Sequence, residues 1–288
     1  MRMMKIVTTR VPATTANLGP GYDCLGIALN IANHVTVQPA GNAEHPKIVA
    51  DATALFFQTA GIEPFGFSWS IEGEVPQSRG LGSSVTVRLG VLHGLDGLCE
   101  GKLGAKRLYE LCAQLEGHPD NAAPAAFGGF TVARAEAETL RCEVDEALKF
   151  ILLIPDFEVS TPAAREILPT TIPRRGAVTS VTNACRITAA FLQRRYELLR
   201  GCFADGLHQP FREPLVPFLS KAIAAGERAG ALGGFLSGSG STICCITLND
   251  EDAVATAMLD AAPPGSRIVV TTADNLGTRP VEPGDVIP

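Results

Sequence analysis

The residues best placed for chemistry in this 288-residue chain are a short run of glycines and serines at positions 79–84, RGLGSS. The mostly apolar run 85–95 follows at once and is typical of a helix. Backbone N–H groups of the turn, two hydroxyls and the positive end of a helix dipole would then face one small volume. That volume suits a phosphate group, so the sequence predicts that the chain handles a nucleotide. The alternative is a structural turn, because Gly-x-Gly occurs in many of them.

A second candidate is the loop 12–23, inside a Gly-, Pro- and Asn-rich stretch that reaches residue 26. An unstructured loop of that length in a compact domain is usually functional. The amide of Asn17 and the carboxylate of Asp23 have the chemistry to hold an ammonium group. The alternative is an Asx-type turn scaffold that only joins two strands.

The segment 117–121, GHPDN, follows a predicted amphipathic helix at 105–116. Pro119 breaks the helical pattern because it disfavours helical backbone at the residue before it. Helix capping is the alternative role for the polar side chains of this turn. Glu110 lies eleven residues before Asn121, about three helical turns, so a continuing helix would put both on one side. A carboxylate there has the chemistry to bind Mg²⁺.

Two arginines and a second glycine–serine run complete the candidates. Arg186 and Arg212 carry guanidinium groups that match carboxylates and phosphates, with surface ion pairs as the alternative. The run 237–241, SGSGS, precedes an apolar strand. Its glycines Gly238 and Gly240 would let the backbone approach a ligand closely, unless the run is only a flexible turn.

These motifs need elements to position them. Apolar alternation and short apolar runs predict strands at 6–7, 34–37, 66–74, 150–154, 242–248 and 267–272. Helical periodicity predicts helices at 179–200, 218–229 and 251–260. Strands and helices interleaved in both halves predict an α+β protein of two domains, 1–145 and 146–288.

Composition excludes several classes of protein. The net charge is −6 without a Lys/Arg run, so we expect no nucleic-acid partner. No apolar stretch is long enough to span a bilayer, so we expect no membrane partner. The eight cysteines are scattered and form no C-x-x-C pair. We therefore expect a reduced, cytoplasmic protein without structural zinc.

Taken together, the five stretches resemble the GHMP kinases, the superfamily of galactokinase, homoserine kinase, mevalonate kinase and phosphomevalonate kinase. The three ordered motifs of that superfamily match residues 11–23, 75–85 and 234–242. The sequences PATTANLGPGYDCLG, GHPDNAAPAAFGG and PDFEVSTPAAREIL are similar to signatures of the homoserine kinase family. The resemblance spans nearly the whole chain.

The resemblance implies a fold, a reaction and two cofactors. The N-terminal domain would resemble domain 2 of ribosomal protein S5, the C-terminal domain would be ferredoxin-like, and the active site would lie between them. The γ-phosphate of ATP would pass, with Mg²⁺, to the side-chain hydroxyl of L-homoserine and form O-phospho-L-homoserine, a step that leads to threonine. The resemblance leaves a homodimer open.

The resemblance also assigns roles to individual residues. Ser84 and Glu110 would hold Mg²⁺, and His118 and Asn121 would position the hydroxyl end of homoserine. A zwitterionic substrate needs an anion for its ammonium group and a cation for its carboxylate. Asn17 and Asp23 would bind the former, Arg186 and Arg212 the latter. The ATP phosphates would lie among Pro76, Arg79, Gly80, Leu81, Gly82, Ser83, Ser84, Gly238 and Gly240.

The general base stays open at this point. Mevalonate and galactose kinases resemble this chain but have an aspartate where this sequence has Asn121, which cannot accept a proton at neutral pH. Asp120 is its neighbour in sequence. Because the transition state of phosphoryl transfer is loose, positioning and charge neutralisation can be sufficient. We therefore expect no strong base and loss of the proton to phosphate or solvent.

The sequence departs from the superfamily pattern in two motifs. The usual small-residue run after GLGSS is replaced by residues 85–88, VTVR, and Arg88, one turn past Ser84, would add a charge near the phosphates or face solvent. Ser239 and Ser241 stand where alanine and proline are common. Two other functions stay open: a GHMP enzyme for another small alcohol, and a non-catalytic ligand sensor on the same fold. A sensor need not keep both Ser84 and Glu110.

Overall fold

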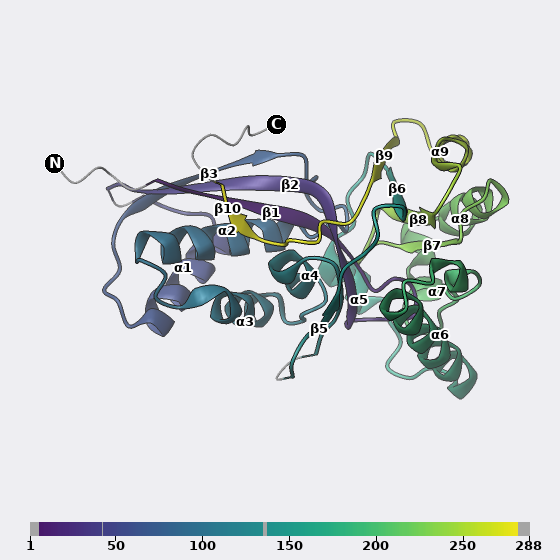
Figure 1. Ribbon diagram of the computed structural model, residues 1–288, viewed down its shortest axis with the longest axis horizontal. Coiled ribbons are helices and arrows are strands. Elements are labelled where there is room, and N and C mark those ends of the chain that lie inside the picture. The colour runs from purple at the N-terminus through teal and green to yellow at the C-terminus, as the bar shows by residue number, and fades with distance from the viewer. Residues whose placement is uncertain (1–5, 42, 135–136, 282–288) are drawn as a thin grey trace.

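The structure is a computed structural model that describes residues 6–41, 43–134 and 137–281. Within these residues the chain forms two antiparallel sheets with helices packed against them, which confirms the predicted α+β class (Figure 1). The first sheet has the order β10–β1–β2–β4–β5, and β3 pairs with the other half of the long strand β2. Its strands are β1 (Val7–Ala16), β2 (Leu25–Pro39), β3 (Phe67–Gly73), β4 (Phe130–Val132), β5 (Leu140–Cys142) and β10 (Arg279–Pro280).

Helices cover one side of the long strands of this sheet, as Figure 1 shows. They are α1 (Lys47–Ala60), α2 (Ser83–Leu98), α3 (Gly104–Glu116) and α4 (Ala122–Phe127). Helix α2 lies close to β2 because two of its facing residues are glycines. A Cβ on Gly90 would fall 2.3 Å from Val35, and a Cβ on Gly94 would fall 2.4 Å from Val37. These two glycines therefore set how deeply α2 packs, and with it the position of the RGLGSS turn that precedes α2.

The second sheet has the order β7–β8–β6–β9. Its strands are apolar on both faces, since Ile151 and Leu153 pack with one set of helices and Phe150 and Leu152 face a separate cluster. Burial on both faces explains why the sequence shows unbroken apolar runs here rather than alternation. The elements are β6 (Lys149–Ile154), β7 (Gly233–Leu236), β8 (Ile243–Thr247), β9 (Arg267–Thr271), with α8 (Leu219–Arg228) and α9 (Glu251–Asp260) on one face.

The other face of the second sheet meets the first domain in one hydrophobic cluster. Helix α6 (Arg174–Leu192) and the short helix η1 (Tyr196–Leu199) contribute Phe191 and Tyr196, and strand β4 contributes Phe130. The rings of Phe130 and Phe191 stack with their centroids 4.4 Å apart. The two domains thus share a core, which fixes the space between them.

The chain crosses from the first sheet to the second between β5 and β6. It then returns, because β10 pairs with β1 and places Thr9 opposite Pro280. Buried Asp274 ties this returning segment down through ion pairs with Arg10 of β1 and Arg279 of β10. The second half of the chain, 146–288, therefore contributes a strand to the first sheet. Residues 282–288 lie outside the described part.

Some sequence-based boundaries were wrong. The expected loop 12–26 is shorter in the structure: residues 12–16 and 25–26 are strand, and only residues 17–24 connect β1 to β2. Pro12 is tolerated inside β1 because the pairing with β2 shifts register there. The helix expected at 179–200 begins at Arg174 and ends at Leu192, and α1 had no counterpart in the prediction.

Two short helices, α5 (Thr161–Glu166) and α7 (Gln209–Arg212), and the 3-10 turn η2 (Glu213–Leu215) complete the second half. Among the described residues, no helix combines the length and apolar character that crossing a bilayer requires.

We predict that Gly94→Ala lowers the free energy of unfolding by about 1–3 kcal/mol, because the added methyl overpacks against Val37. Urea denaturation of both proteins measures this. Gly176→Ala in α6 is the matched control, since the atom nearest to its Cβ would be Gly206 Cα, 3.5 Å away. The control is expected to be at least as stable as the wild type. Equal stability of Gly94→Ala would contradict the packing described for α2.

Candidate active site

One cavity lies between the two sheets and gathers most of the residues that the sequence singled out. Three segments of the first domain and three of the second contribute to its wall. From the sequence-based candidates it collects Asn17, Asp23, Gly80, Gly82, Ser83, Ser84, His118, Asn121, Arg212 and Gly238. Its other lining residues are Ser78, Glu116, Asp120, Thr161, Arg165 and Ser239.

The RGLGSS turn has a backbone that only glycine tolerates at two positions. Gly80 and Gly82 have φ angles of 73° and 70°. A Cβ on Gly80 would fall 2.1 Å from the carbonyl oxygen of Ser237, and one on Gly82 would fall 2.2 Å from the hydroxyl of Thr14. Gly82 directly precedes the first residue of α2, so the free N–H groups of that helix open toward the cavity. This geometry suits an anionic ligand.

Neighbouring candidates hold the turn rather than line the cavity. The buried Leu81 accepts a hydrogen bond from the N–H of Thr14 through its carbonyl at 3.1 Å. Arg79 donates from Nε to the carbonyl of Pro155 at 3.1 Å. Pro76, Arg79, Leu81 and Gly240, predicted to contact the nucleotide, are not among the lining residues.

The carboxylate beside Ser84 belongs to Glu116, not to Glu110. Ser84 Oγ donates to Glu116 Oε2 at 3.0 Å. Glu110 instead forms a half-exposed ion pair with Arg107 on the outer side of α3. Glu110 and Asn121 do not share one side of a continuing helix, because α3 ends at Glu116 and Gly117 adopts a left-handed conformation. The chain therefore changes direction after α3, before it reaches Asn121.

Arg88 is turned inward and does not face solvent. Its guanidinium forms an ion pair with Glu116, the residue that also accepts the hydroxyl of Ser84. The side chains of Arg88 and Glu116 are only 17% and 10% exposed. Glu116 lines the cavity and Arg88 does not, so the guanidinium of Arg88 lies behind Glu116 as seen from the cavity.

The loop 17–24 presents Asp23 and uses Asn17 as its scaffold. Both residues have positive φ angles, 70° for Asn17 and 56° for Asp23, which are rare for residues with a side chain. Asn17 compensates by accepting the N–H of Asp23 at 2.9 Å and donating to the carbonyl of Gly238 at 3.0 Å. Both ends of its amide are therefore engaged with protein, which favours the scaffold alternative for Asn17.

Asp23 meets a cation that the sequence analysis did not select. Arg165 of α5 binds both carboxylate oxygens of Asp23, at 2.8 and 3.1 Å. Arg186, the predicted partner for a substrate carboxylate, is exposed on α6 and outside the cavity lining. The sequence around a single arginine does not show whether it binds a ligand. The one available indication was that Arg165 lies in the segment 155–168, which resembles the homoserine kinase signature.

Arg212 is the more deeply buried of the two arginines that line the cavity, with 2% of its surface exposed. It donates to the carbonyls of Ala164 at 2.9 Å and Gly238 at 3.2 Å, and lies over the ring of Tyr22. Burial lowers its pKa, which reflects the cost of holding a cation away from water. Within the described part of the chain, no carboxylate forms an ion pair with it.

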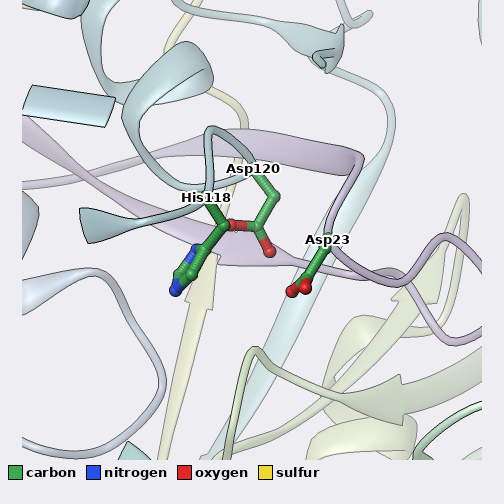
Figure 2. Close-up of side chains that lie close together, drawn as sticks. All are labelled: Asp23, His118 and Asp120. Carbon is green, nitrogen blue, oxygen red and sulfur yellow. The ribbon is translucent and has the colours of Figure 1, made fainter. Parts of the chain in front are cut away.

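The turn after α3 points three polar side chains at the same space. Figure 2 shows His118 and Asp120 on this turn and Asp23 arriving from the separate loop. Asp120 Oδ1 lies 2.7 Å from His118 Nδ1 and accepts the N–H of Asn121 at 3.0 Å. Asn121 in turn accepts the hydroxyl of Thr14 at 2.7 Å. Asp120 thus organises the turn from a position that is 2% exposed.

The carboxylate of Asp120 also controls the charge of His118. Burial alone lowers the pKa of His118, but the hydrogen bond and negative charge of Asp120 outweigh burial. The pKa of His118 is therefore raised above its ordinary value.

Two sets of donors in the cavity have metal-binding chemistry. The ligand atoms of Asp23, His118 and Asp120 lie within 4.8 Å of one another, but Asp23 is paired with Arg165 and His118 with Asp120. Ser84 and Glu116 offer a hydroxyl and a carboxylate 3.0 Å apart beside the anion-binding turn. Hard oxygen donors next to phosphates are what Mg²⁺ prefers, so the second set fits that ion.

Comparison with known families agrees with this architecture. The model of the GHMP kinases N terminal domain matches residues 47–129, and that of the GHMP kinases C terminal domain matches residues 187–263. The fold and the glycine turn thus define a GHMP kinase, as the resemblance implied.

Individual relatives narrow the family. The homoserine kinase of Caldicellulosiruptor bescii is 37% identical over 86% of this chain and 85% of its own length. That of Aquifex aeolicus is 36% identical over 95% of this chain and 99% of its own length. A crystal structure of homoserine kinase from Cytophaga hutchinsonii superposes with a TM-score of 0.88 at 27% identity, covering 98% of this chain and 99% of that one. The chain belongs to the homoserine kinase family.

We predict that Asp120→Asn lowers the pKa of His118 below its ordinary value, because burial persists while the charge is lost. NMR titration of the imidazole in both proteins measures the shift. In the wild type, protonated His118 stabilises the fold below its unfolded-state pKa of about 6.5, and this contribution disappears as pH rises through the raised folded-state pKa. The same pKa in both proteins would contradict this electrostatic assignment.

Proposed function

We propose that this protein transfers the γ-phosphate of ATP to the side-chain hydroxyl of L-homoserine, forming O-phospho-L-homoserine and ADP. Relatives that share about a third of its residues over most of its length carry the name homoserine kinase. The product is an activated amino acid on the route to threonine. The residues of the cavity support this reaction step by step.

The observation that carries the proposal is the buried guanidinium of Arg212. A cation this deeply buried is normally paired with an acidic group, yet Arg212 has only neutral hydrogen-bond partners. It lines a cavity that also holds the carboxylate Asp23. A ligand with a carboxylate and an ammonium group satisfies both charges, and homoserine has both.

The Asp23–Arg165 pair offers a second anchor for such a zwitterion. Its two side chains are about one-third exposed, 32% and 36%, so a ligand can reach both ends of the pair. The ammonium group of homoserine would bind Asp23, and its carboxylate would lie between Arg165 and Arg212. Because the negative and positive side chains lie side by side, they would bind the substrate in one orientation only. Other residues of the cavity would then position its hydroxyl.

The phosphates of ATP would bind the N–H groups of residues 80–84 and the N-terminus of α2. Ser84 and Glu116 would hold the accompanying Mg²⁺. When bound, this ion supplies positive charge to the phosphate oxygens and so favours departure of ADP. The residues themselves keep the triphosphate facing the cavity that contains Asp23 and Arg212.

His118 and Asn121 would position the acceptor hydroxyl, because both line the cavity and both are fixed by Asp120. Asp120 is buried and has three contacts on one oxygen, which favours a positioning role over that of a base. The hydroxyl proton would then leave with the transferred phosphoryl group or to solvent, since a loose transition state needs no strong base.

A coupled assay of ADP release tests the proposal. We expect turnover with Mg-ATP and L-homoserine, and none above background with L-serine, L-threonine, galactose or mevalonate. Turnover with another alcohol would keep the kinase and reject the substrate. Binding of homoserine or nucleotide without turnover would instead indicate a ligand sensor.

We predict that Arg212→Met raises the KM for homoserine by at least about 100-fold, because removing one partner of a buried charged pair costs about 3–5 kcal/mol. The KM for ATP should change by less than about threefold, since Arg212 is assigned to the amino acid alone. Steady-state kinetics at varied homoserine and ATP measure both. Arg186→Met is the control and is expected to match the wild type. An unchanged homoserine KM in Arg212→Met would reject the assignment.

A further inference from the structure

Arg88 of α2 holds a largely buried guanidinium against Glu116, at the wall of the candidate active site. We propose that Arg88 is a resident counter-cation for Glu116 that keeps the nucleotide-free site from holding a divalent ion, so that the ion enters together with the nucleotide. The proposal rests on the proposed function, because it concerns the metal ligands assigned there. On this proposal, Arg88 determines that the metal ion does not bind before the nucleotide.

The place of Glu116 explains why it needs a cation at all times. It is the last residue of α3, where the carbonyl end of the helix dipole repels a negative charge. No basic residue lies in the last turn of α3 itself. The side chain is nine-tenths buried, so water compensates little of its charge. A cation from another element must therefore stand beside it.

Arg88 of α2 provides this cation in the structure. Its Nη1 pairs with Glu116 Oε1, while Ser84 Oγ holds Oε2. Arg88 has no second acidic partner, and its buried Nε has no hydrogen-bond partner among the described residues. The guanidinium is thus held by one carboxylate, and that carboxylate is already neutralised before any ligand arrives.

The balance of charges decides when a divalent ion can join. Without nucleotide, an ion beside Ser84 and Glu116 would share a single carboxylate with Arg88, leaving an excess of two positive charges in a poorly hydrated space. Repulsion between like charges at this range is strong where water is scarce. A triphosphate brings up to four negative charges and reverses the balance, so the ion and Arg88 can then coexist.

Binding of Mn²⁺ alone, followed by electron paramagnetic resonance, tests the proposal on the nucleotide-free protein. Mn²⁺ takes the same oxygen ligands as Mg²⁺. We expect Arg88→Met to bind Mn²⁺ at least about tenfold more tightly than the wild type, because it leaves Glu116 without a cation. Millimolar Mn²⁺ should also raise the melting temperature of Arg88→Met and leave that of the wild type unchanged.

The exposed Arg107–Glu110 pair of α3 provides the matched control. Arg107→Met likewise removes an arginine that is paired with a glutamate, but at an exposed place on α3, and we expect it to bind Mn²⁺ like the wild type. The double variant Arg88→Met/Glu116→Gln should lose the gain seen in Arg88→Met. Equal or weaker Mn²⁺ binding by Arg88→Met would overturn the proposal.

The wild type gives a test that does not depend on the folding of a variant. Its affinity for Mn²⁺ should be at least about tenfold lower without nucleotide than with a saturating nonhydrolysable ATP analogue. Equal affinities would overturn the role of Arg88 even if homoserine is phosphorylated. Absence of homoserine phosphorylation would instead reject the proposed function, whatever Mn²⁺ shows.

Discussion

The site depends on the close approach of three backbone segments at the junction of the domains. The glycine turn lies between the end of β1 and the turn 237–242 of the second domain. Leu81 accepts a hydrogen bond from Thr14, and Gly80 accepts one from Ser237 at 2.6 Å. Any side chain at Gly80 would separate these segments. Both domains therefore hold the glycine turn in place through hydrogen bonds to its carbonyl groups.

The candidate active site also depends on charged side chains that are held away from water or paired with one another. Arg212 is held without an acidic partner, Asp23 is paired with an arginine that a ligand can reach, and Glu116 is paired with Arg88. Arg212 and the Arg88–Glu116 pair lie in poorly hydrated places, where a complementary ligand gains most, whereas the Asp23–Arg165 pair is about one-third exposed. Under the proposed function, these charges would select a zwitterion at one end and a metal-bound triphosphate at the other.

The sequence predicts the motifs well and their partners poorly. Glycines and serines at 79–84 mark the turn because their chemistry is local, and the resemblance of the whole chain predicts the fold. Spacing could not choose Glu116 over Glu110, because the left-handed Gly117 ends the helix on which the argument relied. It could not choose Arg165 over Arg186 either, since Arg165 meets Asp23 from 142 positions away. Such contacts are decided by tertiary packing.

A crystal structure with L-homoserine and a nonhydrolysable Mg-ATP analogue tests the central claim most directly, namely that these charges are arranged for that pair of ligands. The account predicts the homoserine carboxylate against Arg212 and Arg165, its ammonium group against Asp23, and the metal ion against Ser84 and Glu116. A homoserine carboxylate bound away from Arg212, or a metal ion bound by Glu110, would contradict it.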